Sequence, residues 1–193
     1  MLRTISAVLV ATAVVLSAPA FATDLSRGKR AEENGIFERA VAHWFVRTDE
    51  NQRKVLHYYV DAQKTNSGSG SREELRIEVG RERCTSSGNG AYSCRGLQKV
   101  LAQAGDARFS VNEFLSEGTM KLIDERGRKH VVRWRGTDLP GSYSSQMDCG
   151  GGKKETRGLA RPADASGRLF GHTLNVKLMY VGFLARGVSF GDC

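Results

Sequence analysis

The feature that most constrains the fold of this chain is a repeated alternation of apolar and polar side chains with a period of two. In the clearest case, within residues 72–83, Leu75, Ile77 and Val79 alternate with charged residues. Because successive side chains of a strand point to opposite faces of a sheet, this pattern predicts a strand with one buried face. Similar alternation predicts strands over residues 39–47, 54–62, 131–135 and 170–178, with weaker ones over 109–111, 119–123 and 180–185.

Turn-forming residues separate these segments. Residues 48–52, 66–71 and 124–128 are rich in Gly, Asn, Asp and Ser, which accept positive φ or bond to their own backbone. Short strands with regular turns predict an all-β domain, an antiparallel β-sandwich with a β-barrel as the alternative. The spacing within residues 97–104 suits either a helix or a strand, and the Gly- and Ser-rich segment 137–166 predicts one long loop stapled by a disulfide.

The N-terminal residues 1–22 have the three parts of a signal peptide. Arg3 precedes an apolar run over residues 7–16, and Ala20 and Ala22 form an A-x-A cleavage site. The apolar run is shorter than the roughly 20 residues of a spanning helix, and no later segment is as apolar. The sequence therefore predicts a single domain over residues 23–193 that is secreted, or retained in a periplasm or cell wall.

Four cysteines follow the predicted signal peptide, and an even number in an exported chain indicates disulfides. Cys84 and Cys94 flank a turn-forming stretch, so they should meet across a hairpin. That leaves Cys149 to pair with Cys193. A metal site is disfavoured because no C-x-x-C-like pair is present.

The chain carries 29 Lys and Arg against 21 Asp and Glu, a formal net charge of +8. A spread positive charge favours polyanionic partners, although it also serves solubility. An anionic polysaccharide or another extracellular protein is the expected partner. Nucleic acid is disfavoured, because the alternation in residues 129–135 puts Trp134 in the apolar row and leaves Arg133 and Arg135 on the other face, as in a core strand with a basic outer side.

The first two predicted strands place a group of rings on one face. If they form an antiparallel hairpin whose paired residue numbers sum to 102, Trp44 lies opposite Tyr58 in the core row. The opposite row then gathers rings and cations that suit sugars or anionic ligands, unless another part of the chain covers this face. The predicted ligand-binding residues are Arg39, His43, Phe45, Arg47, His57 and Tyr59.

A second candidate is the run Gly151, Gly152, Lys153 and Lys154, where Gly-rich backbone followed by Lys could hold an anion. It is not a P-loop, because Glu155 stands where Ser or Thr is required. A flexible solvated loop explains the same residues.

No catalytic residue or cofactor is indicated. The chain lacks G-x-S-x-G and H-E-x-x-H patterns, and His130 and His172 fall in apolar rows, which predicts core positions. The leading expectation is a secreted, non-enzymatic binding domain for anionic or carbohydrate surfaces. The alternatives are a secreted hydrolase with a site built from loop 137–166, and an extracellular inhibitor or structural protein of the envelope.

Overall fold

The computed structural model describes residues 35–48, 53–66, 73–86, 92–103, 105–149, 152–176 and 179–190. All regular structure in these residues is β, as the alternation predicts, and no helix among them is long and apolar enough to cross a membrane. The predicted signal peptide lies outside the described residues. The strands are β1 (Gly35–Arg47), β2 (Lys54–Asn66), β3 (Glu73–Ser86), β4 (Tyr92–Gln103), β5 (Ala107–Val111), β6 (Glu117–Ile123), β7 (Lys129–Gly136), β8 (Gly141–Cys149), β9 (Gly152–Leu169), β10 (His172–Leu174) and β11 (Met179–Phe190).

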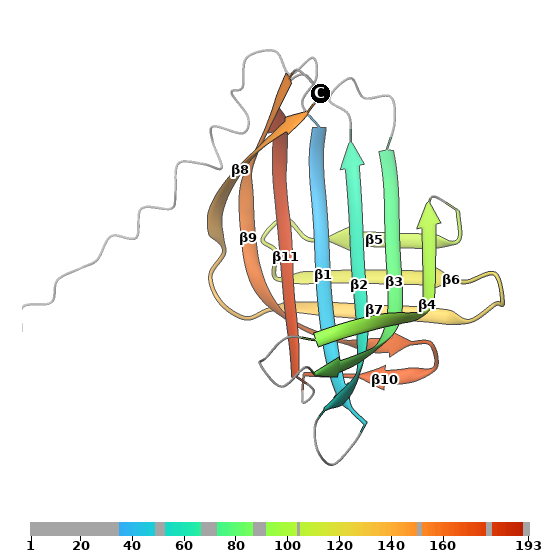
Figure 1. The fold of residues 1–193 in the computed structure, drawn as a ribbon. Coiled ribbons are helices and arrows are strands. Elements are labelled where there is room, and N and C mark those ends of the chain that lie inside the picture. Colours follow the sequence, from blue (N-terminus) through green and yellow to red (C-terminus); the bar gives the residue numbers. More distant parts are fainter. Residues whose placement is uncertain are drawn as a thin grey trace, which may run out of the picture. The chain divides into compact units, whose positions relative to one another are not determined.

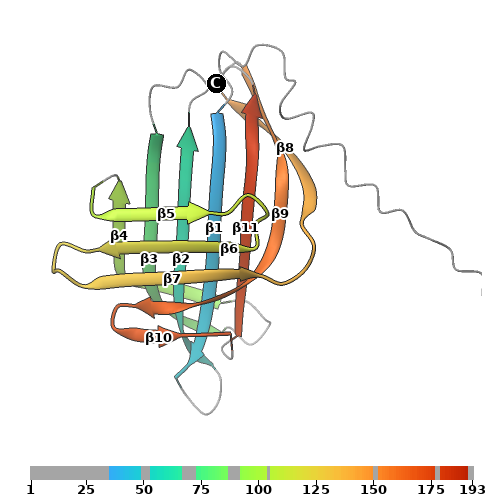
Figure 2. The same ribbon diagram turned by 180° about the vertical axis from the view of Figure 1, so that it is seen from behind.

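The strands form one strongly curled antiparallel sheet, so the predicted two-sheet sandwich is wrong. Nine strands follow the order β4-β3-β2-β1-β11-β9-β7-β6-β5, and β8 and β10 each pair with β9 beside this path. The curl brings β5 against β1, β2 and β3, and Figures 1 and 2 show β5, β6 and β7 crossing those strands. Period-two alternation could not separate the two folds, because a curled sheet and a sandwich both bury one face of each strand.

Strand β9 joins the two halves of the sheet. Its first part pairs with β8 and β11, and residues 163–168 pair with β7 after the strand bends (Figure 1). The predicted loop over residues 137–166 is therefore wrong: most of it is the β8–β9 hairpin. One glycine in it serves a close approach of strands, because a Cβ on Gly158 would lie 2.2 Å from the carbonyl oxygen of Arg186.

The core lies between the two halves of the curled sheet. The predicted apolar rows of β1, β2 and β3 are buried there, with Trp44, Ile77 and Val79 fully inaccessible. They pack against the apolar row of β6 and β7, in which Met120 and Val132 are also fully buried.

Two tryptophans link the halves through reciprocal hydrogen bonds. The indole Nε1 of Trp44 on β1 donates to the carbonyl oxygen of Ala165 on β9, at 3.3 Å. The indole Nε1 of Trp134 on β7 donates to the carbonyl oxygen of Val41 on β1, at 3.0 Å. Because Ala165 lies directly opposite Trp134 in the β7–β9 ladder, both bonds hold the same two segments together.

Two further predictions are confirmed. In β1 and β2, Trp44 lies opposite Tyr58, the register inferred from the sequence. Cys84 and Cys94 lie opposite each other on β3 and β4 and form a disulfide. The predicted Cys149–Cys193 bond lies outside the described residues, because Cys193 is not among them.

Residues 97–103 belong to strand β4, so the strand reading of that segment is correct and the helical one is wrong. The β3–β4 ladder shifts register between Arg81 and Glu82, whose partners are Gln98 and Gly96, so Leu97 is the extra residue of a β-bulge. The helical spacing is misleading because Leu97 and Leu101 are exposed, whereas Val100 packs against the core. In Figure 1, β4 turns sharply along its length.

The two histidines predicted in core rows have different environments. His130 is fully buried, as expected, but His172 is exposed on β10. The turn at Phe170 and Gly171, whose φ angles are 50° and 84°, reverses the chain, so residues 170–178 are not one strand.

The buried ring of His130 is satisfied by hydrogen bonds on both of its nitrogens. Its Nε2 faces Asp124 Oδ2 at 3.2 Å, and its Nδ1 accepts from the backbone N–H of Phe170 at 3.3 Å, which fixes a neutral ring. Burial lowers the pKa of His130 despite the adjacent carboxylate. Burial alone would raise the pKa of Asp124, but donors from Arg128, His130 and Arg126 outweigh it and hold that pKa well below its usual range.

Replacing Trp134 by Phe should lower the free energy of unfolding by about 1–3 kcal/mol, because the substitution removes the indole hydrogen bond and leaves a small cavity. Trp44→Phe should act in the same direction. Since the chain has only these two tryptophans, each variant can be followed by fluorescence of the remaining indole during urea unfolding. Phe114→Leu is the control, because Phe114 is 74% exposed and its change should stay within about 0.5 kcal/mol. Losses no larger than that of the control in both Trp variants would contradict the linking role.

Candidate functional site: two exposed faces of the sheet

The six predicted ligand-binding residues share one side of β1 and β2, which we call the ring face. In the observed ladder, His43 lies opposite Tyr59 and Phe45 opposite His57. The Phe45 and His57 rings lie 4.7 Å apart with planes 7° from parallel, and His43 and Tyr59 are 6.3 Å apart. The sequence-predicted grouping is therefore present, and its ligand-binding role stays a prediction. The rings are half-buried and largely cover one another.

A chain of hydrogen bonds runs through this face. Glu82 Oε2 accepts from His57 Nδ1 at 3.0 Å, and His57 Nε2 lies 2.9 Å from His43 Nδ1. If Glu82 is ionised and both rings are neutral, His57 donates through Nδ1 and must accept at Nε2, so His43 donates through Nδ1. Burial lowers the pKa of His43, and the neighbouring His57 lowers it further.

Two cations on this side of the sheet are paired with acids, whereas Arg47 has no ion pair among the described residues. Arg39 makes two hydrogen bonds to Asp61, at 2.9 and 2.7 Å, which raise the pKa of its guanidinium. Lys99 lies 2.8 Å from Glu78 and lowers the pKa of that carboxyl. Such paired charges leave little positive potential for an anionic ligand.

Tyr59 is also held by this network. Its hydroxyl donates to Glu78 at 3.1 Å, while burial and that bond raise its pKa to about 12. Its ring lies over Gly80 on β3, where an added Cβ would come within 2.1 Å of the ring. The ring face is thus built as a packed, internally hydrogen-bonded surface.

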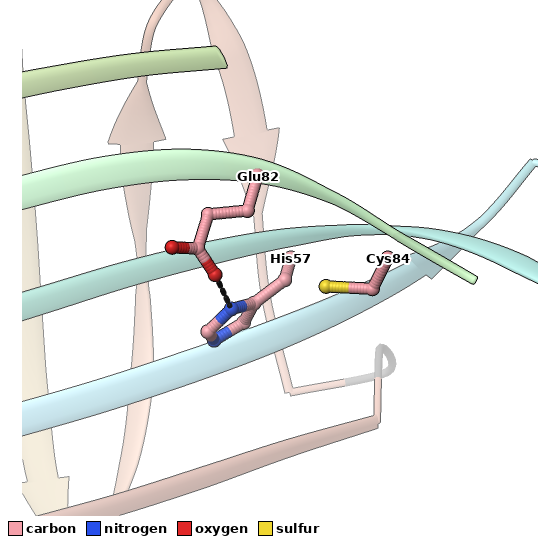
Figure 3. Close-up of side chains that lie close together, drawn as sticks. All are labelled: His57, Glu82 and Cys84. Atoms are coloured by element: carbon pink, nitrogen blue, oxygen red, sulfur yellow. Dashed lines mark hydrogen bonds and ion pairs between the residues drawn. The ribbon is translucent and has the colours of Figure 1, made fainter. Parts of the chain in front are cut away.

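One group on this side has the composition of a metal site. Ligand atoms of His57, Glu82 and Cys84 all lie within 4.8 Å of one another. Figure 3 shows these three side chains close together. Metals bind Cys through the thiolate, and the sulfur of Cys84 is bonded to Cys94. In the disulfide-bonded protein this group therefore offers one imidazole and one carboxylate, which already bond to each other.

The predicted Gly-rich anion loop is in part a strand. Gly152, Lys153 and Lys154 begin β9, where the two lysines lie opposite Asp148 and Met147. Gly151 lies outside the described residues. The anion-binding role of this segment stays a prediction.

The other exposed side of the sheet is different in charge. Along β5, β6, β7 and the second part of β9, every second residue faces away from the core. Arg108 lies opposite Lys121, and Arg133 lies opposite Thr119 and Ser166. We call this surface the basic face. Its members are Arg108, Ser110, Thr119, Lys121, Arg133, Arg135, Ser166 and Arg168.

The central cations of the basic face have no acidic partner. Among the ion pairs of the described residues, none involves Arg108, Lys121 or Arg133. The acids of this surface, Glu117 and Asp164, flank Arg135 at one end of it. Positive charge on the other rows is therefore free to act on a ligand.

Sequence reasoning missed two parts of this description. It did not include Glu78 and Glu82, although extending the hairpin argument by one strand would place both on the ring face. It recognised the basic outer side of residues 129–135 but not that β5, β6 and β9 continue it. That continuation depends on which strands become neighbours, which the alternation does not encode.

Comparison with known proteins adds little to this geometry. No known protein family matches the chain, and no curated protein sequence matches it. Among solved structures, the chain is similar to the crystal structure of "a putative AttH" from Nitrosomonas europaea, with 11% sequence identity and a TM-score of 0.39. The match covers 84% of this chain and 53% of that one, so the present chain spans about half the length of that structure.

The hydrogen-bonded ring face predicts a pH dependence of stability. Because the pKa of His43 is lower in the folded protein than its ordinary value of 6.5, the unfolded chain binds more protons as the solution is acidified. The stability that depends on neutral His43 should be complete above pH 6.5 and should be lost as the pH falls below that value.

His43→Gln keeps a donor toward His57 and should reduce the slope of unfolding free energy against pH between pH 7 and 5. His130 acts in the same direction, so the informative quantity is the difference between the two proteins in urea unfolding. Equal slopes would contradict this account.

Proposed function

We propose that this chain is an exported, non-enzymatic binding domain that recognises an anionic polysaccharide through its basic face. The observation that carries the proposal is the cross-strand grouping of Arg108, Lys121 and Arg133 without acidic partners. Neighbouring strands lie about 4.8 Å apart and alternate residues about 7 Å apart, so these cations form a two-dimensional array rather than a single point of charge. An extended polymer with repeated anionic groups complements such an array.

The side chains between the cations favour a polysaccharide over a nucleic acid. Ser110 and Thr119 lie opposite each other beside Arg133, with their hydroxyl oxygens 3.1 Å apart. Hydroxyl groups suit the hydroxyl and sulfate or carboxylate groups of an acidic sugar. Binders of single-stranded nucleic acid instead use aromatic rings on which bases stack, and the basic face as defined contains none.

The ring face supports the proposal less well. Arg39 and Lys99 on this side are paired with acids, and the rings contact each other, so binding there would have to displace existing interactions. The alternative of a hydrolase had its site in a loop over residues 137–166, and that segment is mainly two paired strands. An inhibitor or structural protein of the envelope is the remaining alternative.

Removing the central cations should weaken polyanion binding. The variant Arg108→Gln/Lys121→Gln/Arg133→Gln should bind heparin, as a sulfated polysaccharide probe, on the order of 100-fold more weakly at low salt, at about 1 kcal/mol for each charge lost. Binding of the unaltered protein should also fall steeply as salt is raised. Isothermal titration calorimetry at two salt concentrations measures both effects.

The matched control removes three other exposed cations, each of which already has an acidic partner. The variant Arg76→Gln/Lys99→Gln/Arg157→Gln changes the net charge by the same amount, and its wild-type side chains are 66%, 58% and 64% exposed. It should retain most of the affinity. Equal losses in the two variants would show that net charge alone acts, and would contradict a defined binding surface.

A further inference from the structure

A second group of cations lies at the curled end of the β3–β4 hairpin. Arg83 and Arg95 are direct cross-strand partners, and the next pair in the same row is Thr85 and Ser93. All four side chains are exposed and line one hollow in the surface, together with Cys94, Gly96 and the bulge residue Leu97. None of the described residues that line this hollow is acidic.

The disulfide fixes this arrangement from the other side of the hairpin. Cys84 and Cys94 are paired between the two rows, with their Cα atoms 4.0 Å apart. Because successive residues of a strand face opposite ways, the sulfur atoms lie on one side of the hairpin, and the two arginines and two hydroxyl groups lie on the other. The crosslink therefore holds the two guanidinium groups in register.

Such a pairing is unfavourable without a ligand. Like charges directly opposite on neighbouring strands repel each other, and neither Arg83 nor Arg95 has an ion-pair partner among the described residues. Arg81 lies in the same row but does not line the hollow, and its Nη1 lies 3.4 Å from His172 Nε2. An anion placed between the arginines would turn this repulsion into two favourable interactions.

We propose that Arg83, Arg95, Thr85 and Ser93 form a discrete site for a tetrahedral oxyanion, a sulfate or phosphate group. Guanidinium groups present planar forks of donors that match such oxygens in pairs, and the two hydroxyls add donors on the adjoining row. The site is separate from the basic face. Its existence does not depend on polysaccharide binding there.

The test compares inorganic sulfate with chloride at equal ionic strength. Sulfate binding, measured by calorimetry and by the melting temperature, should be present in the unaltered protein. In the variant Arg83→Gln/Arg95→Gln, the dissociation constant for sulfate should rise about tenfold or more, since each arginine supplies charged hydrogen bonds. In chloride the same variant should melt at the same or a higher temperature, because the repulsion is gone. If the two arginines only stabilised the fold, the melting temperature of this variant in chloride would be lower than that of the unaltered protein.

Two further variants control for net charge and for folding. Arg76→Gln/Arg157→Gln removes the same charge outside both the hollow and the basic face, and it should leave the sulfate response unchanged. Arg83→Lys/Arg95→Lys keeps both charges but loses the planar forks, so it should weaken sulfate binding less than the Gln variant. Sulfate stabilises folded proteins in general and so acts on every variant. The site is therefore tested by the differences between variants in their response to sulfate. An equal sulfate response in the Gln variant and the unaltered protein would overturn the proposal.

The same oxyanion could be a free ion or an ester on a sugar, and a second titration separates the two sources. A sulfated disaccharide that binds at least tenfold more tightly than inorganic sulfate, with the gain lost in Arg83→Gln/Arg95→Gln, would assign the site to a sugar ester. Equal affinity would assign it to the free ion. Either outcome supports the site, whereas binding of neither probe would overturn it.

Discussion

The two reciprocal indole hydrogen bonds are the contact on which the rest of this structure depends. A single sheet can bury its apolar face only if it folds back on itself, and the strands that meet in this way are far apart in sequence. Trp44 and Trp134 supply both apolar area and directional bonds where β1 meets β7 and β9. One side of the strands in each half of the curled sheet is buried in the core. The opposite sides of the two halves are therefore separate exposed surfaces with different chemistry.

The contrast between those surfaces follows from how their charges are paired. On the ring face, acids on β2 and β3 pair with a cation or an imidazole, as in the Arg39–Asp61 and His57–Glu82 pairs. On the basic face the residues directly opposite Lys121 are Arg108 and Val131, and no ion pair among the described residues involves Lys121. Fixed pairing of the first kind rigidifies a surface, whereas unpaired cations retain a potential that a polyanion can use.

The sequence predicted those features that depend on local pattern or short loops. Alternation placed Trp44 and Tyr58 in one core row, and the turn between Cys84 and Cys94 identified a disulfide pair. It could not predict the curl, because alternation is the same for a sandwich and a curled sheet. Glycine was misleading in residues 137–166, where Gly158 serves a close approach between strands rather than a loop. The sequence could not predict the basic face for a related reason. Its cations come from β5, β6, β7 and β9, and only the strand order makes them neighbours.

The most direct test of this account is the location at which a sulfated oligosaccharide contacts the protein. In a titration of the ¹⁵N-labelled Arg83→Gln/Arg95→Gln variant, which lacks the oxyanion site of the β3–β4 hairpin, the account predicts that amide shifts in heteronuclear NMR concentrate on β5, β6, β7 and residues 163–168 of β9, while the amides around His43 and His57 stay unchanged. Shifts concentrated on the ring face, or a titration that perturbs no continuous surface, would contradict it.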